Sequence, residues 1–145
     1  MEFKIITEEN LEACIDVFIE VFNDDPWNDE WTKETARQYV SDFYKAPNFL
    51  GIIAVKNDEI LGFLYGVNRA WWTGREFYIN EMGVKKEARN KGIGKALVEA
   101  LEKELEGNNV KYISLLTDRG MPAEEFYKAI GFEEVERLVF YSKSI

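Results

Sequence analysis

Three strand-like segments follow one another in the middle of the chain, and this order most limits the folds that it can adopt. Phe49–Lys56, Ile60–Ala70 and Glu76–Val84 are rich in β-branched and aromatic residues, and short stretches separate them. Short connections predict antiparallel pairing between such neighbours. A further segment, Val110–Thr117, follows an amphipathic stretch, so we expect it to join the sheet in parallel through a right-handed crossover.

Apolar residues at helical spacing flank these strands. Helices are expected over Glu8–Phe22, Lys33–Lys45, Gly92–Glu106 and Pro122–Ala129. Thr7 and Thr32 are the expected N-caps of the first two helices, and further short strands are expected at Glu2–Thr7 and Glu134–Tyr141. The expected order is β-α-α-β-β-β-α-β-α-β, which is an α/β (α+β mixed sheet) fold with helices on both faces. At 145 residues it forms a single domain, 1–145.

The chain contains no histidine and one cysteine, Cys14. This excludes Ser-His-Asp and Cys-His couples, an HExxH zinc site and a Cys/His metal site, so we expect no metal. Acid–base chemistry then requires Glu, Asp, Tyr, Lys or water. A single cysteine cannot form an intrachain disulfide, which fits a reducing cytoplasm.

The net charge of −9 argues against general nucleic-acid binding, which needs a broad basic face, and favours a cationic partner such as an amine. No run approaches the ~18–20 apolar residues of a membrane-spanning helix. The first residues, MEFKIITEEN, lack the charged start and apolar centre of a signal peptide. We therefore expect a cytoplasmic protein that binds neither nucleic acid nor membrane.

One basic segment interrupts this acidic chain. Residues 85–95 hold five of the 18 basic residues and one of the 27 acidic residues. Gly92 and Gly94 lie in this segment, where a strand is expected to end and a helix to begin. Free backbone N–H groups and the helix dipole favour a phosphate at such a place. From charge alone, a solvated loop entering an ordinary helix fits equally well.

The spacing of these glycines excludes two common phosphate loops. A dinucleotide fingerprint would need glycine where the chain has Leu97, and a P-loop needs four residues between its glycines. What remains is Arg-x-x-Gly-x-Gly over residues 89–94, followed by Ala-x-x-Phe-Tyr-x-x-x-Gly-Phe over residues 123–132. With these two blocks the chain resembles the GCN5-related N-acetyltransferase (GNAT) superfamily along its whole length.

The resemblance implies acetyl-CoA as acetyl donor. It assigns the pyrophosphate to backbone amides of Arg89, Asn90, Lys91, Gly92, Ile93, Gly94 and Lys95, with nearby lysines adding charge. It also implies that the strand backbone at Met82 and Val84 pairs with the pantetheine arm. Gly83 would let this strand bulge away from its parallel neighbour and open a cleft, although glycine there could merely relieve packing.

The family pattern also implies catalytic residues. Tyr127 matches the position that donates a proton to the departing sulfur, and Glu81 is the candidate base. Glu76, Asp118 or an ordered water are alternatives to Glu81. Gly120 stands where many relatives have an asparagine that contacts the cofactor, which leaves that contact in doubt.

The regions that bind the acceptor in this family hold all four tryptophans, at positions 27, 31, 71 and 72. Trp27 and Trp31 have acidic neighbours, and aromatic faces with carboxylates suit a cationic amine. We assign them, with Asp118, to acceptor binding, although core or dimer contacts explain such tryptophans equally well. Residues 26–32 are similar to the aminoglycoside 6′-N-acetyltransferases.

The expected activity is therefore acetyl transfer from acetyl-CoA to a primary amine, either a small cationic molecule or a peptide terminus. Two other classes of function fit the same residues. One is a catalytically silent module that binds acyl-CoA as a sensor, and the other is a nucleotide-binding regulator. The last strand often joins subunits in this family, which leaves a homodimer open, although the sequence itself does not give the oligomeric state.

Overall fold

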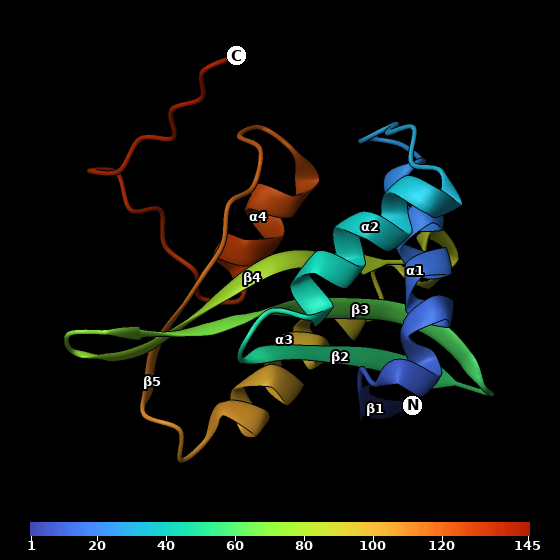
Figure 1. Cartoon of the computed structure of the whole chain (residues 1–145), viewed down its shortest axis with the longest axis horizontal. Coiled ribbons are helices and arrows are strands. Elements are labelled where there is room, and N and C mark those ends of the chain that lie inside the picture. The colour runs from blue at the N-terminus through green and yellow to red at the C-terminus, as the bar shows by residue number, and fades with distance from the viewer.

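The computed structural model describes all residues 1–145 and contains one five-stranded sheet (Figure 1). The strands lie in sequence order: β1 (Glu2–Ile5), β2 (Phe49–Lys56), β3 (Glu59–Trp71), β4 (Gly74–Val84) and β5 (Val110–Ser114). β1 to β4 pair antiparallel, and β5 pairs parallel to β4. The expected hairpins and the parallel crossover are confirmed.

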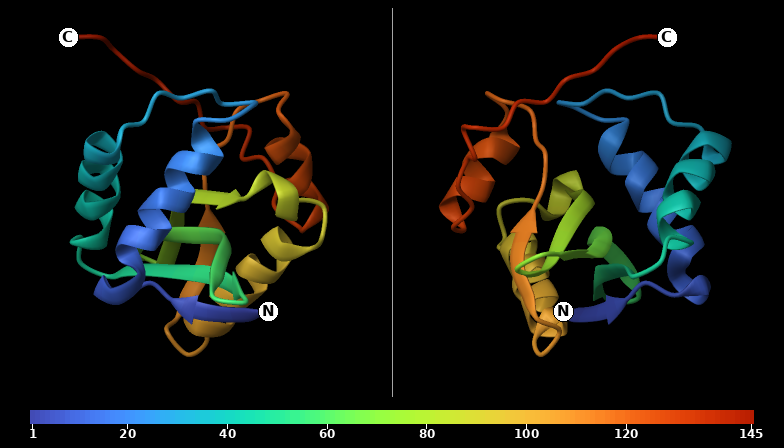
Figure 2. Two further views of the ribbon diagram at one scale, coloured as in Figure 1. Left: turned by 90° about the vertical axis from the view of Figure 1, so that its right-hand side faces the viewer. Right: turned by 60° about the vertical axis from the view of Figure 1, so that its left-hand side comes forward.

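Helices cover both faces of this sheet. They are α1 (Glu8–Phe22), α2 (Lys33–Tyr44), α3 (Ile93–Leu105) and α4 (Pro122–Ala129), with a 3-10 turn at Lys86–Ala88. α1 and α2 lie on one face, and α3 and α4 on the other (Figure 2). At the start of α2, the Thr32 hydroxyl accepts a hydrogen bond from the Thr35 amide at 3.0 Å, as expected of an N-cap. The expected fold class is confirmed, and none of the helices is long and apolar enough to cross a membrane.

Each face of the sheet has its own apolar core. α1 and α2 bury Phe18 and Val40 against the β3 side chain of Phe63. On the opposite face, α3 packs Leu97 against Phe77 of β4. These two cores fix both sides of β4, which is the strand that carries the candidate base Glu81.

A β-bulge in β4 lies at Asn80 and not at Gly83. Tyr65 pairs with Glu81 while its neighbour Gly66 pairs with Ile79, so Asn80 is the extra residue. β5 pairs with β4 only as far as Tyr78, and beyond it the two strands separate. The cleft expected from the sequence therefore opens just where the bulge lies.

Gly83 has a packing role instead. A Cβ built on Gly83 would lie 2.8 Å from Cγ1 of Val21 on α1 and 3.2 Å from the Phe63 ring. The absent side chain lets α1 approach the sheet closely, so the packing explanation of this glycine is the right one.

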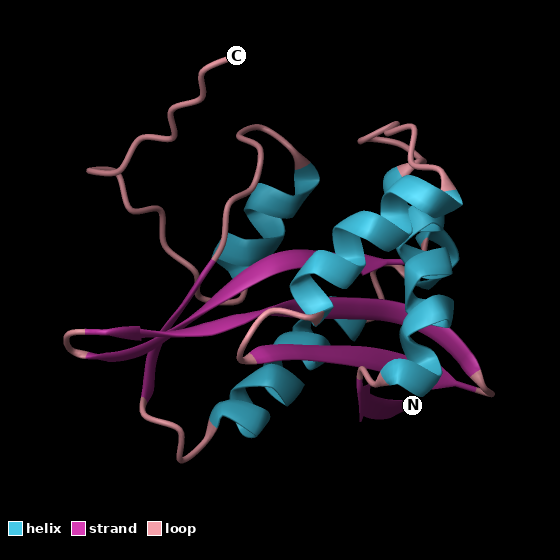
Figure 3. Ribbon diagram, viewed as in Figure 1, coloured by secondary structure: helices cyan, strands magenta, loops and turns pink.

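The strand expected at Glu134–Tyr141 does not form, and this prediction is wrong for the chain as described. Residues 130–145 have no partner in the sheet and form a tail without helix or strand, whose end lies away from the sheet (Figures 2 and 3). A strand exists only where a neighbour completes its hydrogen bonds. The apolar side chains of residues 134–141 consequently stay exposed, from 53% for Val135 to 88% for Tyr141.

Candidate active site

A cavity of about 490 Å³ lies where β4 and β5 diverge. It brings together residues from the α1–α2 loop, β4, the segment after β5, and α4. Five of the predicted site residues line it: Trp27, Glu81, Met82, Asp118 and Tyr127. Trp27 and Tyr127, which are 100 positions apart in the sequence, thus line the same cavity.

Glu81 lies in this cavity with one carboxylate oxygen hydrogen-bonded. The Tyr39 hydroxyl of α2 donates to Oε1 of Glu81 at 2.7 Å. Burial raises the pKa of Glu81 to about 7, the Tyr39 hydrogen bond opposes that rise, and the negative charge of Asp29 adds to it. Glu81 therefore exchanges a proton near neutral pH, which suits a general base.

Tyr127 supplies a protonated hydroxyl to the same cavity. Its ring makes edge contacts with Phe126 and Phe132 at centroid distances of 5.2 and 5.5 Å. Burial, with a smaller effect from the charge of Glu81, raises the pKa of Tyr127 to about 12. The phenol therefore stays protonated at neutral pH and can act as a proton donor.

The N-terminus of α3 presents backbone amides that no side chain caps. Gly92 is the N-cap residue, with φ of 80°, and its first turn contains no acidic residue. The first helical hydrogen bond runs from the Ala96 amide to the Gly92 carbonyl at 3.0 Å. The amides before Ala96 lack helical acceptors, which leaves them available to an anion.

The two glycines of the motif meet different needs. At Gly92 a Cβ would meet nothing within 4 Å, so its positive φ alone favours glycine. At Gly94 a Cβ would lie 2.9 Å from the Phe126 ring, so glycine there lets α4 pack against α3. This contact connects the anion-binding turn to the helix that carries Tyr127.

Two basic side chains of the segment point away from the amides. Arg89 donates from Nε to the Val84 carbonyl at 3.0 Å, and its guanidinium lies 5.6 Å from the centre of the Trp27 ring. Lys85 pairs with Glu59 at 3.1 Å and Glu20 at 3.5 Å. Lys86, Lys91 and Lys95 are exposed, and Lys95 also pairs with Glu99 at 3.9 Å, so Lys86 and Lys91 supply the unpaired positive charge that faces solvent.

The tryptophans divide into three groups. Trp27 lines the cavity, while Trp31 packs behind it between Phe18 and Tyr39. The Trp31 indole donates from Nε1 to Oδ2 of Asp29 at 2.9 Å, which orients a carboxylate at the cavity. Trp71 and Trp72 lie at the end of the β3–β4 hairpin, 61% and 87% exposed, and do not line the cavity.

Other residues considered from the sequence lie elsewhere. Glu76 accepts a hydrogen bond from the Ser114 hydroxyl at 2.8 Å, outside the cavity. Arg119, next to Gly120 in the sequence, forms ion pairs with Glu124 and Glu134. Gly120 adopts φ of 81°, a conformation that favours glycine. No group of acidic or cysteine side chains is arranged to hold a metal ion.

Sequence reasoning did not find two residues of the site, Tyr39 and Asn80. Asn80 lines the cavity, and its buried Oδ1 has no hydrogen-bond partner. Asn80 stands between Ile79 and Glu81, and no local pattern in the sequence marks the bulge at this position. Tyr39 lies 42 positions from Glu81, and no local pattern marks that pairing.

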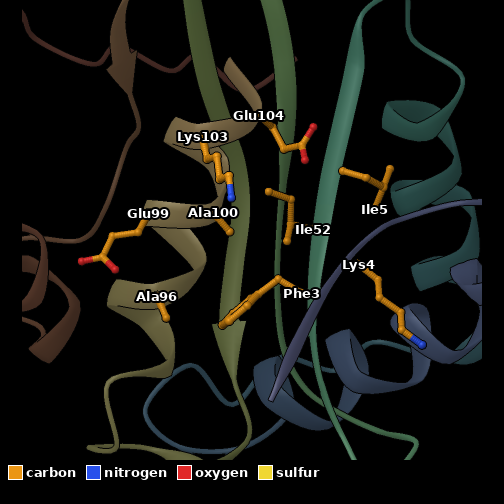
Figure 4. Close-up of a pocket in the computed structure, with 9 residues that line it drawn as sticks. All are labelled: Phe3, Lys4, Ile5, Ile52, Ala96, Glu99, Ala100, Lys103 and Glu104. Carbon is orange, nitrogen blue, oxygen red and sulfur yellow. The ribbon is translucent and has the colours of Figure 1, made fainter. Parts of the chain in front are cut away.

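A second cavity, of about 460 Å³, lies between β1 and α3 (Figure 4). Phe3 reaches from β1 toward Ala96 and Ala100 of α3, and Ile52 of β2 forms the floor between them. It contains no tyrosine, and none of the predicted site residues line it. The candidate catalytic residues therefore lie in the first cavity and not in this one.

The chain belongs to the acetyltransferase (GNAT) family, whose model matches residues 11–132. Acetyl transfer is therefore its class of reaction. Similar solved structures include an integron cassette protein from the mobile metagenome of V. cholerae, with 24% identity and a TM-score of 0.83 over 99% of this chain and 91% of the other. No curated protein matches the chain.

Two aminoglycoside acetyltransferases share the fold. The aminoglycoside N-acetyltransferase AAC(6′)-Iy, solved in complex with CoA, is 18% identical with a TM-score of 0.78, covering 99% of this chain and 95% of that one. The aminoglycoside antibiotic 6′-N-acetyltransferase from Acinetobacter haemolyticus is 16% identical with a TM-score of 0.79, covering 100% and 99%. At these identities the likeness is one of fold.

Proposed function

We propose that the protein transfers the acetyl group of acetyl-CoA to the primary amine of a small cationic molecule. One observation carries the proposal: a carboxylate whose pKa is about 7, Glu81, and a protonated phenol, Tyr127, line one cavity at the divergence of β4 and β5. A base that titrates near neutrality and an acid that stays protonated are the two groups that acyl transfer to an amine needs.

The residues present fit acetyl-CoA. The uncapped amides between Arg89 and Lys95 suit its pyrophosphate, and the exposed lysines add positive charge there. From Met82 to Val84 the edge of β4 that faces β5 has no strand partner, so its backbone can pair with the pantetheine arm. Acetyl-CoA supplies an activated thioester, and the protein supplies binding, orientation and proton transfer.

Three groups of the protein account for the proton transfers and the charge that develops during acetyl transfer. Glu81 accepts the proton that the acceptor ammonium must lose before its nitrogen can attack. The Met82 amide stabilises negative charge on the thioester oxygen while the new C–N bond forms. Tyr127 donates a proton to the sulfur as the C–S bond breaks, and its phenolate takes up the second proton that the nitrogen loses on becoming an amide. Glu81 then returns its proton to solvent, so the ammonium loses two protons, the thiol gains one and one is released.

Carboxylates at the cavity support a cationic acceptor. Asp29 and Asp118 line it together with Glu81. Because the Arg89 guanidinium already lies over the Trp27 ring, we assign recognition of the cation chiefly to the two aspartates. Trp27 then forms an apolar wall, and Trp31 acts indirectly by orienting Asp29. The volume of the cavity suits a small molecule.

Release of free thiol from acetyl-CoA, measured against a panel of mono- and polyamines, tests this function. We expect release that depends on the amine and saturates with it, together with an acetylated amine identified by mass spectrometry. Tight binding of acetyl-CoA without turnover of any amine would instead support an acyl-CoA sensor. Binding of ATP in place of CoA in calorimetry would support a nucleotide-binding regulator.

Substitution of Gly92 tests the anion-binding turn. Gly92→Ala forces a side chain into a left-handed conformation, which costs about 1–2 kcal/mol and disturbs the amides that face the pyrophosphate. We expect the KM for acetyl-CoA to rise about tenfold, which corresponds to ~1.4 kcal/mol. Steady-state kinetics at a saturating amine concentration measures this change.

Gly107 provides a matched control at the other end of α3. Its φ is 78° and a Cβ would meet nothing within 4 Å, so Gly107→Ala carries the same backbone strain. We expect a similar loss of thermal stability but an unchanged KM for acetyl-CoA. Equal KM values in the two variants would show that the turn at Gly92 does not bind the donor.

We also propose that two copies of the chain associate along β5. β5 pairs with β4 on one edge only, and residues 134–141 have no strand partner and keep exposed apolar side chains. The free edge of β5 has backbone groups without hydrogen-bond partners, and residues 134–141 have strand composition but no strand partner. The segment of one copy could therefore pair with the β5 edge of the other. Phe140 of this segment lines the main cavity, so association would also order one of its walls.

Sedimentation velocity tests this association. We expect a dimer for the unmodified protein and a monomer for Leu138→Lys, because a charged side chain cannot be buried without a partner. Ser142→Lys adds the same charge beyond the apolar run and should leave the dimer intact. A monomer for the unmodified protein at micromolar concentration would contradict the proposal.

A further inference from the structure

We propose that Tyr39 is a positioning residue for the general base: its hydroxyl anchors one oxygen of the Glu81 carboxylate and leaves the other free for the acceptor. The donor–acceptor distance is 2.7 Å, within the range of a short O–H···O bond. Oε2 of Glu81 has no hydrogen-bond partner in the protein. This inference rests on the acetyl-transfer function proposed above.

The ring of Tyr39 is held in place before any substrate binds. It lies 5.1 Å from the Trp31 ring, 5.1 Å from Phe43 in an edge contact, and 5.7 Å from Phe18. These three aromatic residues come from α1, α2 and the loop between them. The hydroxyl is therefore directed at Glu81 by packing and does not need to reorient during the reaction.

The surroundings of Glu81 give this bond its importance. No lysine or arginine forms an ion pair with Glu81. The titratable groups that face it are Tyr39 from α2, Tyr65 from β3, Tyr78 from β4, Tyr127 from α4 and Asp29 from the α1–α2 loop. Among them only Tyr39 donates a hydrogen bond to the carboxylate, so it is the one protein group that directly stabilises the charged form.

The sign of the effect follows from this geometry. A hydrogen bond donated to a carboxylate favours the charged form and lowers its pKa. Burial acts in the opposite direction and is the larger influence, which leaves the pKa of Glu81 at about 7. Without the Tyr39 hydroxyl the carboxyl would hold its proton to higher pH, and less base would be available under neutral conditions.

Tyr39→Phe tests the role because it removes the hydroxyl and keeps the packed ring. Because the lost hydrogen bond stabilises the charged carboxylate, we expect the acid limb of the kcat/KM profile to move up by about 1–2 pH units. Near pH 6.5 the rate should fall about tenfold or more, with much of the loss recovered at high pH. The KM for acetyl-CoA should stay unchanged.

A second readout does not depend on catalysis. In protein labelled with ¹³C at glutamate carboxyls, the Glu81 signal, assigned by its absence in Glu81→Gln, should titrate at higher pH in Tyr39→Phe. Tyr44→Phe is the control, since Tyr44 lies on the same helix, packs on Phe49 and makes no hydrogen bond to Glu81. It should move neither the signal nor the rate profile.

The outcomes separate the two claims. An unmoved Glu81 midpoint in Tyr39→Phe would overturn the positioning role, even if thermal stability fell. If the titration midpoint of Glu81 moves in Tyr39→Phe while the kcat/KM profile does not, the Tyr39–Glu81 hydrogen bond is supported. That result would overturn the assignment of Glu81 as the base, and with it the function on which this inference rests.

Discussion

Glu81→Gln is expected to lower kcat/KM for the amine by about 10²- to 10⁴-fold at neutral pH, which is the range for loss of a general base. The substitution keeps the shape of the side chain and removes its ability to accept the proton of the ammonium. The Tyr39 hydroxyl can still donate to the amide oxygen of glutamine, so the local packing persists. Steady-state thiol release with the best amine of the panel measures the effect.

The same substitution should stabilise the fold at high pH. The pKa of Glu81 rises from 4.5 to about 7 on folding, so between these values the folded state binds more protons than the unfolded state. Stability due to this group therefore falls as pH rises through that window. At pH 8 we expect Glu81→Gln to unfold with a free energy higher by roughly 1–3 kcal/mol. If Glu81→Gln loses activity but gains stability, unfolding is excluded as the cause of the lost activity.

Glu76→Gln is the matched control for both measurements. Glu76 lies on the same strand, but its carboxylate bonds to Ser114 outside the cavity. Its removal should leave the rate within about twofold and should not raise stability. A large loss of rate in Glu76→Gln with a normal rate in Glu81→Gln would show that Glu76, and not Glu81, is the general base.

Tyr127→Phe is expected to lower kcat by about 10²-fold, with little change in the KM for acetyl-CoA. The phenylalanine ring keeps the edge contacts with Phe126 and Phe132, so the melting temperature should change little. What is lost is the proton that the departing sulfur needs. A donor thioester with a more acidic thiol should restore much of the rate, since its thiolate leaves without protonation.

Tyr44→Phe again controls for loss of a hydroxyl as such. A kcat for Tyr127→Phe that matches the unmodified protein across the pH range would remove Tyr127 from the acid role. Recovery with the acidic thiol in Tyr127→Phe but not in Glu81→Gln would separate the two proton transfers from each other.

Sequence periodicity predicted most of the fold because each element carries its own signal. Glu8–Phe22, Phe49–Lys56 and Pro122–Ala129 have the expected bounds, since a capping residue, a turn or a proline marks their ends. The C-terminal strand was the exception. Residues 134–141 have strand composition, but a strand also requires a partner, and the sequence of one chain does not say whether that partner is available.

The details of the site depended on contacts between distant segments. Gly83 and Gly94 were each assigned to the cleft or the phosphate, yet the residues that exclude a side chain there are Val21 and Phe126. The inward turn of Arg89 toward Trp27 had no local signal either. What the sequence could supply was the pair of chemical groups, Glu81 and Tyr127, because residue type and motif position suggested them directly.

The pH dependence of kcat/KM, recorded in parallel for the unmodified protein and Glu81→Gln, tests the central claim most directly. We predict an acid limb near pH 7 for amine-dependent thiol release by the unmodified protein, set by the pKa of Glu81. In Glu81→Gln that limb should be absent and the rate low across the range. An identical limb in both proteins would contradict the claim that Glu81 takes the proton of the acceptor amine.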